Sequence, residues 1–247
     1  MSFYYSRVFK EFKPIYLEIN GAIDKLRESF NTTGLLVCGE SHGVRENADL
    51  AYTLCKLLGV RQLAIERSET NFRHFIESAI KGNPKFLSPQ ALQSIQSSVL
   101  SIEMLKVIAT LFNQNEIKKI HYVDIDSLAN PSLDTDNLNQ LMQIREQEIA
   151  KNIIKSSTNP ILVILGSFHT RLEADDIKLD SALKLIRDDK PATYLKYDYL
   201  SGSQYNSGRV LNFENRLGEY KNSGATIYQE SNDNFIIEIP KATMIKT

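Results

Sequence analysis

Two of the four histidines in this chain, at positions 42 and 169, follow the same local pattern. The segments 35–42 and 162–169 each begin with a run of apolar residues and end in Gly-x-x-His. An apolar run that stops at a glycine predicts a buried strand, with the histidine just beyond its carboxyl end. In open α/β sheets, ligands bind at the carboxyl edge of the strands. The pattern therefore predicts that His42 and His169 lie at one edge of a sheet.

Apolar periodicity divides the rest of the chain into alternating helices and short strands. We expect helices over 14–30, 45–58, 69–81, 88–112 and 136–156, and strands over 34–38, 62–66, 120–126, 161–165 and 194–199. Strands that alternate with helices are typical of parallel βαβ units. The expected fold class is therefore α/β, with a central, mostly parallel sheet and helices on both of its faces.

The C-terminal third differs from this alternation. Two apolar stretches, 226–229 and 235–239, flank a polar Ser-Asn-Asp-Asn sequence and predict a terminal β-hairpin. The segment 201–224 is rich in Ser, Gly, Asn and Tyr, which indicates a long loop or lid. We expect a single domain over 1–247, with the motifs confined to a core of about 34–170.

Composition excludes several classes of partner. The formal net charge of −1 provides no field that would attract nucleic acid. No apolar stretch is long enough to cross a membrane, and the first residues lack the features of a signal peptide. We therefore expect a cytoplasmic protein without a membrane segment, and a secreted effector is the alternative. The oligomeric state stays open.

Acidic and imidazole side chains gather where the strands are expected to end. Glu40 and His42 follow the first strand, Glu66 ends the second and His169 follows the fourth. A carboxylate beside an imidazole can activate water, directly or through a metal ion. A mixed set of His and Glu ligands suits Zn, Mn, Fe or Co. The four residues are therefore candidate ligands of a divalent metal, and the alternative for Glu66 is a solvated acid paired with Arg67.

Arg145 is unusual because it lies on the inward stripe of the helix expected at 136–156. A buried arginine needs polar partners, which Glu40, Glu66 or an anionic oxygen of a substrate would provide. The alternative is a surface arginine paired with Glu146 or Glu148.

The remaining polar residues are weaker candidates. Asp124, Asp126 and Arg45 stand at strand ends or turns, whereas His74 and His121 are expected to be structural or exposed. No Gly-x-Ser-x-Gly elbow and no glycine-rich phosphate loop are present, which disfavours a serine hydrolase and a nucleotide cofactor.

The motifs resemble those of one superfamily. In order, they are Gly39-Glu40-Ser41-His42-Gly43, the strand ending in Glu66, Arg145-x-x-Glu148-Ile149-Ala150-x-Asn152, and Gly166-x-x-His169. This superfamily joins the erythromycin esterases, ChaN-like haem-uptake proteins, TraB-type proteins, TIKI proteases and a domain of Pasteurella-type toxins. The TIKI and TraB side of the resemblance implies a metal-dependent hydrolase, and the ChaN side implies haem binding through a tyrosine.

The leading hypothesis is a hydrolase of an ester or amide bond in a small-molecule or peptide substrate. His42 and His169 would hold a divalent metal or position a water molecule, Glu40 or Glu66 would act as general base, and Arg145 would stabilise negative charge. In a metal-free version, His42 itself is the base. The alternatives are a haem- or other ligand-binding protein without turnover and a toxin or effector module.

Overall fold

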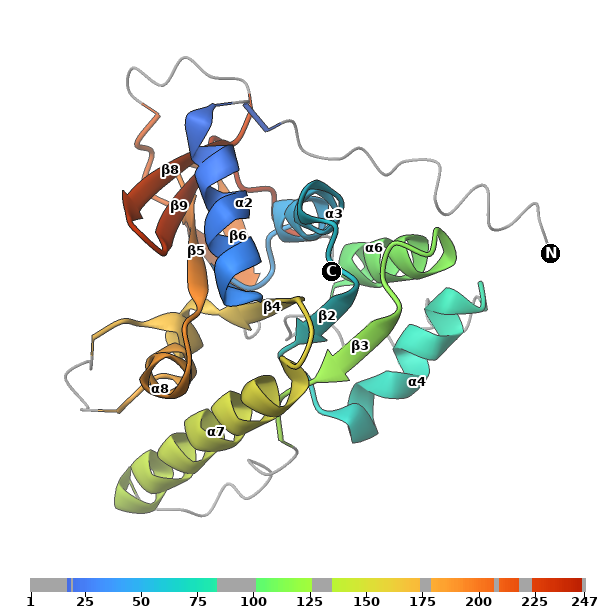
Figure 1. The fold of residues 1–247 in the computed structure, drawn as a ribbon, viewed down its shortest axis with the longest axis vertical. Coiled ribbons are helices and arrows are strands. Elements are labelled where there is room, and N and C mark those ends of the chain that lie inside the picture. Colours follow the sequence, from blue (N-terminus) through green and yellow to red (C-terminus); the bar gives the residue numbers. More distant parts are fainter. Residues whose placement is uncertain are drawn as a thin grey trace.

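The centre of the computed structural model is a seven-stranded sheet in the order β3-β2-β4-β1-β5-β9-β8 (Figure 1). The structure describes residues 17–18, 20–83, 101–125, 135–173, 179–206, 209–217 and 224–245. The strands are β1 (Leu35–Glu40), β2 (Gln62–Ile65), β3 (Lys119–Tyr122), β4 (Ile161–Gly166), β5 (Thr193–Tyr199), β8 (Thr226–Ser231) and β9 (Asn234–Ile239). Neighbouring strands are parallel except for the pair β8 and β9, which forms the C-terminal hairpin. The expected fold class is confirmed.

The two strands that precede the Gly-x-x-His histidines are neighbours inside the sheet. All six residues of β1 and all six of β4 are buried, as expected for parallel strands covered on both faces. Their register pairs Glu40 with Gly166, so both strands end at the same level. The segments that carry His42 and His169 therefore leave the sheet side by side.

Helices cover both faces of the sheet. Alternate residues of each strand face opposite sides, so the buried strands contribute apolar side chains to two separate cores. The helices are α2 (Gly21–Thr33), α3 (Glu46–Leu58), α4 (Glu69–Ile80), α6 (Ile102–Asn113), α7 (Thr135–Ser156) and α8 (Ala182–Asp189). The apolar sides of α2, α3, α4 and α6 belong to one core with Leu36 and Ile164. The apolar sides of α7 and α8 belong to the other core with Val37 and Val163, and Figure 1 shows these two helices together on one side of the sheet.

Several elements differ in extent from the expected ones. Helix α2 begins at Gly21, and residues 14–16 of the expected helix lie outside the described residues. Only the last part of the helix expected at 88–112 is described, as α6. Strand β3 ends at Tyr122, earlier than the end expected at 126, although the backbone amide of Val123 still bonds to the carbonyl of Ile65 at 3.2 Å.

The segment 201–224 contains an antiparallel pair of short strands, β6 (Ser203–Asn206) and β7 (Arg209–Asn212). Gly202 precedes them with a φ of 99°, a conformation that glycine tolerates. The amide of Tyr205 donates to the carbonyl of Gly43 at 3.3 Å, which joins this pair to the loop that carries His42. Its role as a lid stays a prediction.

Among the described helices, none is long and apolar enough to span a membrane.

Two helices that begin after a serine differ in how that serine is used. Ser101 Oγ accepts a hydrogen bond from the amide of Met104 at 3.1 Å at the start of α6, whereas Ser68 makes no such bond at the start of α4. Ser101→Ala should lower the free energy of unfolding by about 1 kcal/mol, the usual cost of a lost N-cap. Ser68→Ala should cost less. Urea unfolding of both variants measures the difference, and equal costs would contradict the assignment.

Candidate functional site

Four neighbouring strands bring acidic and imidazole groups to one edge of the sheet. Glu40 is the last residue of β1, Glu66 follows β2, and Asp124 lies two residues beyond β3. His169 lies in the short 3-10 helix η2 (Ser167–Thr170), which directly follows β4. Because β3, β2, β4 and β1 are adjacent and parallel, these four residues share the carboxyl edge.

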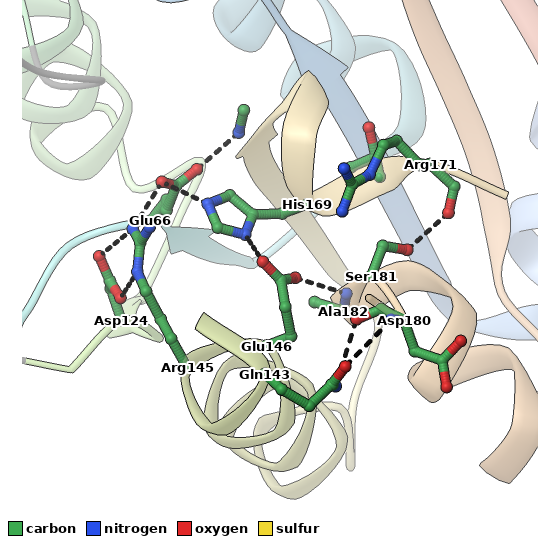
Figure 2. Close-up of polar contacts among 12 residues, drawn as sticks. Glu66, Asp124, Gln143, Arg145, Glu146, His169, Arg171, Asp180, Ser181 and Ala182 are labelled. Carbon is green, nitrogen blue, oxygen red and sulfur yellow. Dashed lines mark hydrogen bonds and ion pairs between the residues drawn. The ribbon is translucent and has the colours of Figure 1, made fainter. Parts of the chain in front are cut away.

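The carboxylate of Glu66 is the centre of this cluster (Figure 2). Its Oε1 lies 3.0 Å from Nη2 of Arg145 and 3.1 Å from Nε2 of His169, and its Oε2 accepts a hydrogen bond from the amide of Gly166 at 2.6 Å. Burial raises the pKa of Glu66, but the positive charges of His169 and Arg145 outweigh it and hold the pKa far below its usual value. Glu66 is therefore a buried carboxylate that stays ionised.

His169 is held between two carboxylates. Its Nδ1 lies 2.6 Å from Oε1 of Glu146, a buried residue of α7, and its Nε2 faces Glu66. The other oxygen of Glu146 accepts a hydrogen bond from the amide of Ala182 at 2.7 Å, as Figure 2 shows. Burial lowers the pKa of His169, but Glu66 and Glu146 outweigh it and raise the pKa to about 9. At neutral pH the ring is therefore an imidazolium that donates through both nitrogens.

Arg145 projects inward from α7, as the sequence predicted. Its Nε and Nη2 bind both oxygens of Asp124, at 2.8 and 2.7 Å, and Nη2 also reaches Glu66. Burial lowers the pKa of Arg145, but the carboxylates of Asp124 and Glu66 outweigh this effect and raise the pKa. The alternative surface pairing with Glu148 is not seen, because that residue pairs with Lys151 at 3.0 Å.

His42 is the accessible histidine of the site. Its side chain is 21% exposed, against 4% for His169. Its Nδ1 lies 3.5 Å from Oε1 of Glu40, and its Nε2 lies 3.9 Å from Oε1 of Glu66. The ring packs against Gly166, where a Cβ atom would be 2.5 Å from both Cε1 and Nε2. This close approach explains the glycine of the second motif in physical terms.

Glu40 lies beneath His42 and is fully buried. Burial raises its pKa, and the nearby charge of Glu66 adds to this effect, whereas His42 opposes it. Oε2 of Glu40 and Nδ1 of His42 are both buried without a hydrogen-bond partner in the described part of the chain. The pair is therefore close enough to interact electrostatically but is not locked in one hydrogen-bonded geometry.

A small polar network fixes the turn between Glu40 and His42. The hydroxyl of Tyr199 donates to Oδ1 of Asn47 at 2.5 Å, and Nδ2 of Asn47 donates to the carbonyl of Ser41 at 2.8 Å. The amide of Ser41 in turn donates to the Tyr199 hydroxyl at 3.3 Å. Two separate elements, α3 and β5, thus hold the backbone of this turn.

The structure brings the five principal candidates together, namely Glu40, His42, Glu66, Arg145 and His169. Asp124, a weaker candidate, also belongs to the cluster, and Asp126 lies outside the described residues. Arg45 is exposed at the start of α3. Away from the site, His121 is bonded to Gln62 at 2.7 Å, and His74 packs on Phe75 with ring centroids 3.8 Å apart.

Glu146 is the residue that the sequence reasoning missed as a member of the site. The sequence indicates Glu146 only as a surface partner of Arg145, yet it is completely buried against His169. Its position three residues before the buried Ile149 places it on the inward stripe of α7, and this spacing was the available signal.

The arrangement does not suit the expected metal ligands. Within the described ranges, no group of three or more His, Cys, Asp or Glu residues is arranged to hold a metal ion. A ligating histidine must be neutral, but both ring nitrogens of His169 face carboxylates, and both oxygens of Glu66 already accept hydrogen bonds. The set His42, His169, Glu40 and Glu66 therefore does not fit a metal ion as arranged, and metal binding is unconfirmed.

The raised pKa of His169 predicts a loss of stability at alkaline pH. The stabilisation gained from protonated His169 should be complete below about pH 6.5 and should disappear as the pH rises through about 9. In urea unfolding, the difference between wild type and His169→Gln should shrink over this range by up to a few kcal/mol. Glu146→Gln removes one of the negative charges that raise the pKa of His169, so the stabilisation should be lost at a lower pH. A difference that does not change with pH would refute the imidazolium.

Comparisons with known proteins support the fold. No protein-family model matches the chain, and no curated protein sequence matches it significantly. Among solved structures, a succinoglycan biosynthesis protein matches 98% of this chain and 97% of its own, with a TM-score of 0.60 and 12% identity. The erythromycin esterase EreC, solved as a point mutant in its open conformation, matches 88% of this chain and 92% of its own, with a TM-score of 0.58 and 8% identity.

The type III effector HopBA1 is also similar. The match covers 91% of this chain and 95% of that protein, with a TM-score of 0.52 and 14% identity. At these identities the similarities show a shared fold, which this chain has in common with an erythromycin esterase and a type III effector.

Proposed function

We propose that the chain hydrolyses an ester or amide bond, with His42 as the general base. The observation that carries this proposal is the contrast between the two histidines. His169 is buried and uses both ring nitrogens on carboxylates, whereas Nε2 of His42 lies 3.9 Å from its nearest carboxylate and the side chain is partly exposed. A general base needs an accessible nitrogen that can reach a water molecule.

In the proposed reaction, Nε2 of His42 takes a proton from a water molecule whose oxygen attacks the carbonyl carbon. The carbonyl oxygen becomes negatively charged in the tetrahedral intermediate. When this intermediate collapses, the bond to the leaving oxygen or nitrogen breaks, and the imidazolium of His42 returns the proton to that atom. The products are a carboxylic acid and an alcohol or amine.

The surrounding charges suit these steps. The ionised Glu66 near Nε2 stabilises the positive charge that His42 acquires, and Glu40, 3.5 Å from Nδ1, orients the ring once the protonated ring donates a hydrogen bond to it. Arg145 uses Nε and Nη2 to bind Asp124 and Glu66, which leaves Nη1 to donate to the anionic oxygen of the intermediate. His169 and Glu146 act as positioning residues, because they hold Glu66 and do not face the substrate.

The esterase among the structural neighbours supports a hydrolase at the level of reaction class. The substrate of that enzyme is not transferred to this chain. Haem binding and an effector role, the latter compatible with the fold of HopBA1, stay predictions, as does a cytoplasmic location.

His42→Asn should lower kcat by at least about 100-fold, because a positioned general base contributes about 10²–10⁴-fold. Glu40→Gln should have a smaller effect, since it alters only the orientation of the base. The assay is release of 4-nitrophenol from neutral esters together with a panel of peptide amides. His74→Asn, on the exposed side of α4, is the matched control and should retain activity. Unchanged turnover by His42→Asn would overturn the proposal.

Chelation separates the metal-free mechanism from the metal-assisted one. Because both ring nitrogens of His169 face carboxylates and both oxygens of Glu66 accept hydrogen bonds, we expect dialysis against EDTA to leave the esterase activity unchanged. Elemental mass spectrometry of the dialysed protein checks that any metal has been removed. Loss of activity that returns on addition of Zn, Mn, Co or Fe would instead favour the metal-assisted mechanism.

A further inference from the structure

The turn between β2 and α4 contains polar atoms that nothing in the described part of the chain satisfies. Nε and Nη2 of Arg67 and Oγ of Ser68 are all buried and have no hydrogen-bond partner. The two residues are consecutive, and they directly follow Glu66. Three unsatisfied atoms on adjacent residues, beside a candidate active site, call for a physical explanation.

Arg67 is not explained by packing alone. Its guanidinium lies over the ring of Phe72 at 4.8 Å, and such stacking occupies a face of the group and leaves its N–H edges free. Burial lowers the pKa of Arg67 to about 10, against the raising effect of Glu66 and Asp124, so the side chain remains cationic at neutral pH. Buried N–H donors of a cation are costly when no acceptor is present.

The neighbouring carboxylates do not take up these donors. Glu66 accepts hydrogen bonds from Arg145 and Gly166, and Asp124 binds Arg145 through both of its oxygens. The alternative pairing of Glu66 with Arg67 is not seen, because Glu66 pairs with Arg145. The backbone of Arg67 is satisfied: its amide donates to the carbonyl of Ile65 at 2.8 Å, and its carbonyl accepts a hydrogen bond from the amide of Asp124 at 3.2 Å.

Ser68 adds an independent observation. It is 7% exposed and precedes α4, a helix of 12 residues, yet its hydroxyl does not cap the helix. By contrast, the serines at the same position of α6 and α8, Ser101 and Ser181, both accept a hydrogen bond from the third amide of their helix. The hydroxyl of Ser68 is therefore free to donate at the positive end of a helix, where anions are favoured.

We propose that Arg67 and Ser68 bind an anionic group, a carboxylate or a phosphate, carried by the substrate. The charge and planar donor edge of Arg67 suit both groups, and the Ser68 hydroxyl adds a third donor. Glu66, Asp124 and Glu40 all act on the pKa of Arg67, so its guanidinium lies near the acidic cluster that surrounds the proposed catalytic base. The assignment to a substrate depends on the proposed hydrolase activity, whereas anion binding does not.

Anion binding is tested first, without turnover. Inorganic phosphate and acetate are titrated separately at constant ionic strength, while ¹H–¹⁵N spectra follow the arginine Nε–H signals. The expected result is a saturable shift of one signal that is missing in Arg67→Gln, with affinity several-fold weaker in Ser68→Ala. The tighter of the two probes identifies the class of anion.

Arg73→Gln is the matched control for this titration. Arg73 is an exposed arginine of α4, paired with Glu69 and Glu77, so its loss should leave anion binding unchanged. Absence of a saturable shift with both probes, or equal binding by Arg67→Gln, would overturn the subsite. Ser68→Ala keeps the test valid if Arg67→Gln fails to fold.

The second test connects the subsite to catalysis. Hydrolysis of 4-nitrophenyl hemisuccinate, which carries a carboxylate, is compared with that of 4-nitrophenyl butyrate, which is neutral. Arg67→Gln should lower kcat/KM for the anionic ester about 10- to 100-fold, the range expected for a lost charge-assisted contact, and should leave the neutral ester unaffected. An equal decrease for both esters would overturn the role in substrate recognition.

The two tests also separate the two proposals. Anion binding without hydrolysis of either ester would contradict the hydrolase and support the subsite. Hydrolysis of the neutral ester without anion binding would support the hydrolase and overturn the subsite.

Discussion

The buried, ionised carboxylate of Glu66 is the constraint on which the rest of the site depends. A carboxylate at the end of an interior strand is stable only if positive charge and hydrogen-bond donors surround it. Arg145, His169 and the amide of Gly166 provide these donors. The two charged partners are in turn balanced by Asp124 and Glu146, so one buried charge organises residues from β2, β4, α7 and the turn after β3.

This charge compensation gives the histidines of the two Gly-x-x-His motifs different environments. In the second motif, the 3-10 turn after β4 turns His169 inward, between Glu66 and Glu146. In the first motif, the turn after β1 leaves His42 partly exposed and in contact with Gly166. The histidine that is fixed as an imidazolium cannot accept a proton, so the remaining histidine is the one suited to act as a base.

The sequence correctly predicted those features of the fold and the site that a local residue pattern determines. The apolar runs before each Gly-x-x-His unit predicted the buried strands β1 and β4, and an arginine on an inward stripe predicted that Arg145 finds a carboxylate. The features that the sequence did not predict depend on packing between residues that are far apart along the chain. The sequence pattern did not predict helix α8, whose first residue, Ala182, donates its backbone amide to Glu146. The histidine and glutamate side chains at the strand ends suggested a metal site. The protonation of His169 depends on its contacts with Glu66 and Glu146, which the spacing of residues along the sequence does not reveal.

Arg145 and Arg67, two arginines at this edge of the sheet, differ in how well their donors are satisfied. Arg145 makes three hydrogen bonds to two carboxylates, whereas the buried Nε and Nη2 of Arg67 make none in the described structure. A fold selected for stability alone would replace a partly buried cation that has unsatisfied donors by an apolar side chain of similar volume. Natural proteins tolerate such a cost mainly where a functional group must be kept ready for a partner. Arg145 thus belongs to the framework that holds Glu66 in place, and Arg67 has the properties of a group whose partner comes from outside the chain.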